Sequence, residues 1–238
     1  MNTVVAGITY RAVLSRRRVL LLVPLPVILI GLAVLLRAIG ENGENSTVLL
    51  MRSFSIGAML PLLGLIAGTG VISPEIDDGT ILHLLAKPIS RPTIATTKFV
   101  VAATVLALFA AVPTFIAAYV MVRGEAGIAY GFGLGALAGG LAYAAVFLLL
   151  GVLTRHAVTI GIIYALVWEG LVGGLVPGAR TFSIQQWAQA IADQVSSSAF
   201  FSADVSLGFA VPALLIVTVG GVVCAGRRLR SLSLTGDE

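Results

Sequence analysis

Charged residues are scarce in this chain of 238 residues. Asp, Glu, Lys and Arg make up 11% of it and hydrophobic residues 58%, whereas about a quarter of a soluble domain is charged. The single cysteine, Cys224, excludes an intrachain disulfide and a cluster of thiolate metal ligands. No polar stretch is long enough to build a core of its own. The composition therefore places most of the chain in a lipid bilayer, and we predict a single transmembrane domain over residues 1–238.

The sequence also lacks the motifs of common catalytic sites. It contains no G-x-x-x-x-G-K-[ST] loop for binding nucleotide phosphates and no G-x-S-x-G nucleophile motif. His83 and His156 have no cysteine or carboxylate nearby at metal-ligand spacing. We therefore predict no catalytic residue and no metal site, and we expect that the chain is not itself an enzyme.

Six apolar runs meet the length of about 20 residues that a helix needs to cross a bilayer. Eleven of the 15 Lys and Arg residues fall on the side of both termini, which predicts that both termini are cytoplasmic. Four prolines, Pro24, Pro26, Pro61 and Pro113, lie inside these runs and are expected to kink them. The predicted spans are 19–36, 54–72, 99–122, 131–153, 157–175 and 207–225.

Two further segments have the pattern of short amphipathic helices. Residues 1–18 carry Val4, Val5, Ile8 and Ala12 at roughly helical spacing, which predicts a helix on the cytoplasmic membrane face. Residues 184–195 also show an apolar stripe, and the Ser183-to-Gln186 spacing is typical of a capping box. This second helix either lies at the outer interface or dips into the bilayer. It either caps an exit path or is a packed linker.

Trp187 in that outer helix suits the level of the lipid headgroups. Small residues recur every fourth position in two of the predicted spans, which allows close approach of helices in lipid. This packing occurs either within the chain or at a subunit interface. The repeated glycines are Gly131, Gly135 and Gly139 in the fourth span, and Gly64 and Gly68 in the second.

The longest polar interval between two strongly apolar runs is Ser73–Lys98. Ser73 and Pro74 suit the start of a helix, three acids follow near its positive end, and Pro88 ends it. We predict a cytoplasmic helix over about 75–86. The alternative from the residues alone is a solvated loop whose charges set the topology.

This segment resembles the cytoplasmic loop of permease subunits of type-2 ABC exporters. The matching residues read Glu75, then Gly79-Thr80-Ile81, Leu84-Leu85 and Lys87-Pro88-Ile89-Ser90-Arg91, with Lys98 opening the third span. The resemblance implies that the 75–86 helix is a coupling helix inserted into a separate ATP-binding subunit, with Glu75 as an acidic contact. The implied contact residues are Glu75, Asp77, Asp78, Gly79, Thr80, Leu84, Leu85, Lys87 and Arg91.

The resemblance further implies an ATP-driven exporter in the plasma (inner) membrane. Two ATP-binding subunits would hold ATP and Mg²⁺, so this chain would carry no cofactor, and a second permease would complete a homodimer or a related heterodimer. Membrane lipids are expected partners and nucleic acid is not. The apolar spans mildly favour a lipid-like or amphiphilic cargo. The alternatives are an ion-driven secondary carrier, a membrane-embedded enzyme, or a scaffold without an ATPase partner.

Glu169 is the one acid inside a predicted span, next to Trp168. A carboxylate facing lipid is costly, so it should face the protein interior or water. One interpretation places Glu169 and Trp168 in the translocation path or its gate. The other makes Glu169 structural, either paired with Arg180 or Arg52 or simply protonated.

Overall fold

The structure is a computed structural model, and it describes residues 3–41, 43–73, 75, 90–122, 126–172, 178–196 and 201–231. Every regular element in these ranges is a helix. Five of the helices are long and apolar enough to cross a bilayer. Apart from Glu75, the predicted coupling helix lies outside the described residues. The same holds for Asp77, Asp78, Gly79, Thr80, Leu84, Leu85 and Lys87.

The N-terminal amphipathic helix is present as α1 (Thr3–Val13). It packs on the third span, and the hydroxyls of Tyr10 and Thr104 are hydrogen-bonded. The residues of the predicted apolar stripe do not all face the bundle, because Val5, Thr9 and Val13 are buried while Ile8 is exposed. Apolar side chains such as Ile8 need no protein cover where lipid surrounds them, so contact with the bundle selects the buried face.

The first span consists of α2 (Arg16–Leu22) and α3 (Pro24–Ala38), which meet at Val23. Pro24 begins α3, where its missing N–H costs no hydrogen bond. The predicted span 19–36 is thus confirmed as a helical region, extended by one or two residues at each end.

The second and third spans begin earlier than predicted. The second runs through α4 (Glu44–Leu50), η1 (Met51–Met59) and α5 (Leu60–Gly70). The third runs through α8 (Arg91–Leu106), η2 (Ala107–Ala111) and α9 (Val112–Met121). The helices η1 and η2 are π-helical, and each ends two residues before a proline, Pro61 and Pro113 respectively. The wider turn accommodates the backbone that each proline disrupts.

Two long helices complete the bundle. The fourth span is α10 (Ala126–Leu153), which packs against most of the other spans, and the sixth is α14 (Leu207–Ser231). Gly64 and Gly68 of α5 face α10, where a Cβ atom would lie 2.7 Å from the Cβ of Tyr143 and 2.6 Å from the Cβ of Phe147. These small residues therefore serve packing within the chain.

The predicted fifth span differs most from an ordinary transmembrane helix. It begins as α11 (Ala157–Ile163) and continues as the π-helical η3 (Tyr164–Val172), and residues 173–177 are not described. One row of residues faces the bundle, spaced by four and ending in Glu169, while Ile163, Leu166 and Val167 are exposed. The buried row is Ala157, Gly161, Ala165 and Glu169.

The predicted outer helix is α13 (Ile184–Ser196), preceded by the short η4 (Arg180–Phe182). It runs antiparallel to α10, because Gly139, Gly135 and Gly131 meet Ala188 and Ala192 in reverse order along α13. A Cβ atom at Gly135 would lie 2.5 Å from the Ala188 carbonyl oxygen. The glycine stripe of the fourth span is thus filled by a helix of the same chain.

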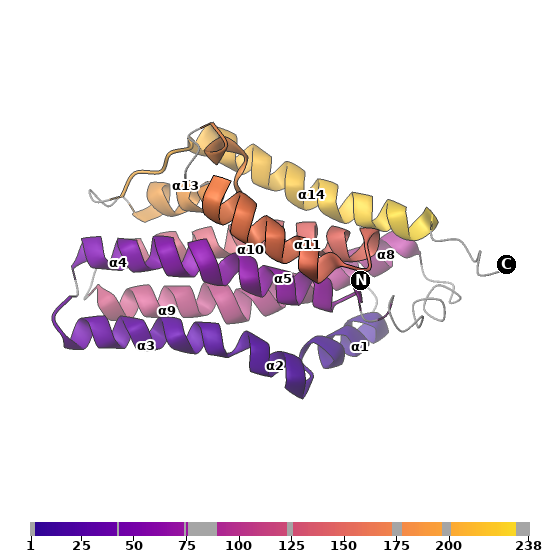
Figure 1. The fold of residues 1–238 in the computed structure, drawn as a ribbon, viewed down its shortest axis with the longest axis horizontal. Coiled ribbons are helices and arrows are strands. Elements are labelled where there is room, and N and C mark those ends of the chain that lie inside the picture. The colour runs from indigo at the N-terminus through magenta and orange to yellow at the C-terminus, as the bar shows by residue number, and fades with distance from the viewer. Residues whose placement is uncertain are drawn as a thin grey trace.

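The bundle has two distinguishable ends. Figure 1 shows α3, α9, α10 and α14 running along the long axis, with α1 and the last turns of α14 at one end and the start of α4 at the other. Arg91, the first residue of α8, donates a hydrogen bond to the Leu229 carbonyl near the end of α14, 3.2 Å away. The second span therefore ends, and the third begins, at the end that carries α1, which we call the α1 end.

Candidate functional site

The buried carboxylate of Glu169 lies at the N-terminus of α13. Its side chain is 1% exposed. The Tyr164 hydroxyl donates to it over 2.7 Å, and the backbone N–H groups of Ile184 and Gln185 donate over 3.2 and 3.4 Å. The Ser183 hydroxyl is a fourth donor. Four donors and the positive end of a helix dipole thus compensate a charge that would otherwise be costly to bury.

Ser183 completes the cap of α13. Its hydroxyl oxygen accepts a hydrogen bond from Gln186 N over 3.3 Å, and its carbonyl accepts from Trp187 N over 3.1 Å. Ser183 N donates to the Arg180 carbonyl over 3.2 Å. With the bonds from Ile184 N and Gln185 N to Glu169, all four N–H groups that a helix leaves unpaired at its start have acceptors. The Ser183 half of the predicted capping box is present, but the buried Gln186 Oε1 has no hydrogen-bond partner and does not complete the box. The sequence did not predict that Glu169 shares the cap.

This capped helix start lies about halfway along the bundle. Gln185 lies beside Gly57, and Ala188 lies beside Gly139, which are near the middle of the second span and of α10 respectively. Of the two predicted positions for the outer helix, the structure therefore has the one inside the bundle. Helix α13 packs along the first half of α10, and Gly161 of α11 lies beside Phe147 in the second half, so the two segments cover different halves of α10.

The two tryptophans both bond to the short η4 segment through their ring N–H groups. Trp187 is 5% exposed and belongs to the hydrophobic core, with its ring N–H bonded to the Thr181 carbonyl at 2.8 Å, so it packs inside the bundle. Trp168 is 36% exposed, and its ring N–H donates to the Phe182 carbonyl over 3.3 Å. Both side chains therefore hold η4, the segment directly before α13.

The predicted ion-pair partners of Glu169 have a different acceptor. Arg52 and Arg180 both bind Asp204, with nitrogen-to-oxygen distances of 3.3 and 3.0 Å. The Arg52 guanidinium also lies 5.8 Å from the centre of the Phe201 ring. These contacts fasten the connection between α13 and α14. The structural interpretation of Glu169 is thus supported through a helix cap, not through either arginine.

A second ionic site lies at the α1 end. The Lys98 side chain is fully buried, and its ammonium group binds Glu75 Oε1 at 2.7 Å and the Val71 carbonyl at 2.5 Å. Glu75, predicted as an acidic contact for a partner, is 21% exposed in this structure. The sequence indicates Lys98 only as part of the family motif. It does not predict the ion pair, because the apolar pattern of a helix does not show which residue on another segment a lysine meets.

A groove of about 450 Å³ opens between α2, α5 and α11. Its polar end is at the α1 end, where Arg18 donates to the Gly70 carbonyl over 2.6 Å. The rest of the groove is mainly aliphatic, so the groove as a whole is amphipathic. The lining residues are Arg18, Leu21, Leu62, Leu65, Ile66, Thr69, Gly70, Ser73, Val158 and Ile162.

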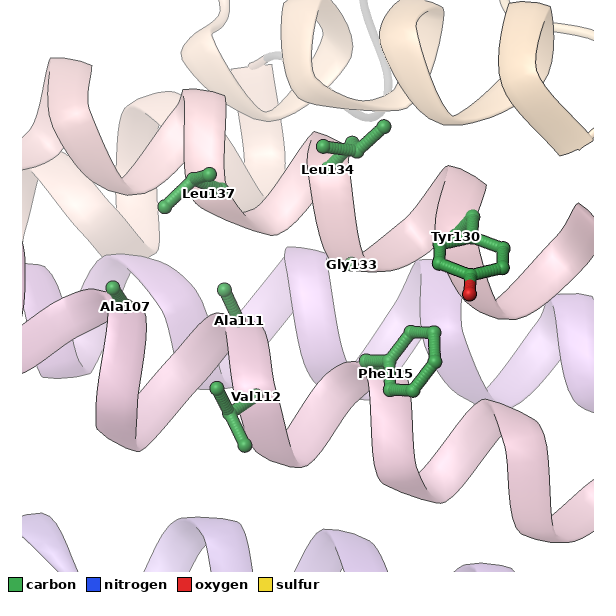
Figure 2. A pocket seen from close by; sticks show the side chains of 8 residues that line it. All are labelled: Ala107, Ala111, Val112, Phe115, Tyr130, Gly133, Leu134 and Leu137. Carbon is green, nitrogen blue, oxygen red and sulfur yellow. The ribbon is translucent and has the colours of Figure 1, made fainter. Parts of the chain in front are cut away.

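A smaller hollow of about 270 Å³ lies between α10 and the third span, and no charged side chain lines it. Figure 2 shows the rings of Phe115 and Tyr130 facing each other at one end of it, with centroids 5.1 Å apart. Gly133 and two alanines, Ala107 and Ala111, leave the space open. Its chemistry suits lipid chains and gives no reason to assign it a polar ligand. Across the described part of the chain, His, Cys, Asp and Glu form no group able to hold a metal ion.

The five long apolar helices define a multi-pass membrane protein. The family model described as ABC-2 family transporter protein matches residues 5–207, which is most of the chain, and the protein belongs to this family. It is therefore a transport component of the permease type, as the loop at 75–98 indicated. No curated protein matches the chain at the level of sequence comparison.

Proposed function

We propose that this chain is the membrane-spanning subunit of an ATP-driven exporter, residing in the plasma membrane and working with a separate ATP-binding subunit. The match of the ABC-2 family model across residues 5–207 carries this proposal, because that range includes the segment whose motif resembles a coupling loop. In this arrangement the α1 end faces the cytoplasm, in agreement with the excess of Lys and Arg there.

The ATP-binding subunit would dock on residues 75–86 and neighbouring Arg91. Two such subunits, with ATP and Mg²⁺ between them, would close and push on the ends of α5 and α8. Both helices belong to long continuous spans that contact α10. Movement at the α1 end would therefore pass into the bundle through rigid helices, while this chain makes and breaks no covalent bond.

The groove between α2, α5 and α11 supports an amphiphilic cargo. Its guanidinium end suits an anionic or polar head, and its aliphatic wall suits an acyl chain. The exposed apolar face of α11 and η3 borders this groove and would pack against a second permease subunit. Such a dimer would form the translocation path between the two copies.

The test of docking is an Asp78→Arg variant, which reverses a predicted contact charge without touching a described span. We expect normal insertion in the membrane, loss of the co-purified ATP-binding subunit, and loss of ATP-driven transport of a fluorescent phospholipid or amphiphilic dye into inverted vesicles. Glu41→Arg is the matched control, since Glu41 is exposed at the opposite end. Docking and transport should survive this control.

The alternatives give different results in the same assay. A scaffold predicts that the Asp78→Arg variant assembles like the parent chain. An ion-driven carrier predicts that this variant transports like the parent chain and that an ion gradient without ATP supports uptake. ATP-independent uptake by the purified chain would refute the proposed function.

A further inference from the structure

The buried Lys98 ammonium joins the third span to the end of the second. Lys98 belongs to α8, while Val71 and Glu75 follow the last residue of α5. A buried lysine is costly unless it is paired and hydrogen-bonded. Here the carboxylate of Glu75 pairs with it at 2.7 Å, and a carbonyl at the negative end of the α5 dipole accepts a second bond.

Two cations from different spans converge on the end of α5. Arg18 of the first span binds the Gly70 carbonyl at 2.6 Å, and Lys98 of the third span binds the adjacent Val71 carbonyl. The chain then turns, with hydrogen bonds from Ile72 N to the Thr69 carbonyl and from Glu75 N to the Ile72 carbonyl. The direction in which the chain leaves the second span is thus held by these directional bonds, together with the burial of Val71 and Ile72 in the core.

We infer that Lys98 is a positioning residue, whose ion pair with Glu75 sets where the connection between the second and third spans leaves the bundle. Glu75 then acts within the permease, through Lys98, and is not primarily a contact for the ATP-binding subunit. The consequence for transport rests on the proposed function. The structural role of Lys98 in holding the end of α5 is independent of that function.

The unequal exposure of the pair gives the inference a distinctive signature. Lys98 is fully buried, whereas the Glu75 side chain is 21% exposed. Removing the lysine leaves a carboxylate that water can reach, while neutralising the glutamate leaves a buried ammonium without its counter-charge. Glu75→Gln should therefore reduce transport per ATP hydrolysed at least as much as Lys98→Met does. Adding Lys98→Met to Glu75→Gln should cause no further loss.

The first measurement needs only the full chain purified in detergent. Hydrogen exchange of a peptide covering residues 71–75 should be roughly tenfold faster in Lys98→Met, because the end of α5 loses its anchor. Exchange in α4, at the opposite end, should not change. Arg227→Met is the control, since it removes an exposed cation at the same end. Unchanged exchange at residues 71–75 in Lys98→Met would overturn the inference.

The second measurement is transport per ATP hydrolysed by the assembled transporter. We expect roughly a tenfold loss in Lys98→Met, within the range typical of coupling between sites, partial recovery in Lys98→Arg, and no larger loss in the double variant than in Glu75→Gln. If Lys98→Met keeps the wild-type ratio of transport to ATP hydrolysis while Glu75→Gln lowers it, the inference is overturned and Glu75 is a contact for the ATP-binding subunit. If the wild-type chain shows no ATP-driven transport, the proposed function fails while the exchange result still decides the role of Lys98.

Discussion

Glu169→Ala removes the acceptor on which four donors converge, so its cost can be worked out from those contacts. Loss of an N-cap acceptor costs about 1 kcal/mol, and each buried donor left without a partner costs about 1–3 kcal/mol. The backbone N–H groups of Ile184 and Gln185 and the Tyr164 hydroxyl all lose their acceptor. Because water entering the new space recovers part of this, we expect Glu169→Ala to lower the free energy of unfolding by about 3–5 kcal/mol.

Glu169→Gln separates the charge from the shape of the side chain. The amide oxygen keeps one acceptor for the start of α13, while its NH₂ group faces donors, so we expect a loss of about 1–2 kcal/mol. The order wild type, Gln, Ala should be visible in equilibrium unfolding in mixed micelles. Hydrogen exchange at residues 184–187 should show the same order, since these amides lie in the capped turn.

The control is Glu41→Ala, which removes an exposed carboxylate just after α3 and outside the α13 cap, and it should change stability by less than about 0.5 kcal/mol. Ser183→Ala should not add its full cost to Glu169→Ala, because the two side chains share one cap. An unfolding free energy for Glu169→Ala within about 0.5 kcal/mol of the wild type would refute the cap. Transport by Glu169→Gln, with partner binding retained, then tests the separate prediction that this residue also affects the translocation path.

Two further predictions concern how α13 packs. Gly135→Ala should lower the free energy of unfolding by about 1–3 kcal/mol, because the new Cβ atom would lie 2.5 Å from the Ala188 carbonyl oxygen. Gly220→Ala in α14 should instead be neutral or stabilising, since no atom lies within 4 Å there and alanine favours a helix, and equal losses in the two variants would contradict this packing. Trp187→Phe should cost about 1 kcal/mol through the lost bond to the Thr181 carbonyl, measured by thermal unfolding in detergent, and no change would mean that this bond does not hold the turn.

Five of the six predicted spans coincide with helices that are long and apolar enough to cross a membrane. They could be predicted from the sequence because the bilayer imposes a local requirement. A helix must present an apolar surface about 20 residues long, and such a surface is written in consecutive residues. The 75–98 motif is likewise local, and it indicated the family that the comparison then established. The span boundaries were less accurate, because a helix continues into polar residues such as Glu44 and Arg91 wherever tertiary contacts or water satisfy them.

The pairings across the bundle could not be predicted in the same way. The stripe of Gly131, Gly135 and Gly139 allowed either a second subunit or the same chain as its partner, since a surface of small residues does not specify what fills it. Glu169 could have met either arginine, but the turn after η3 brings the start of α13 to its carboxylate. Lys98 and Glu75 likewise meet only when the second and third spans are in place.

The sequence by itself determined that this protein lies in a membrane, where its helices run and to which family it belongs. The tertiary structure alone decided what each buried charge is for. The physical reason is that hydrophobic burial in lipid is set by consecutive residues and has no direction, whereas a buried charge is stabilised by specific donors and acceptors that come from distant parts of the chain.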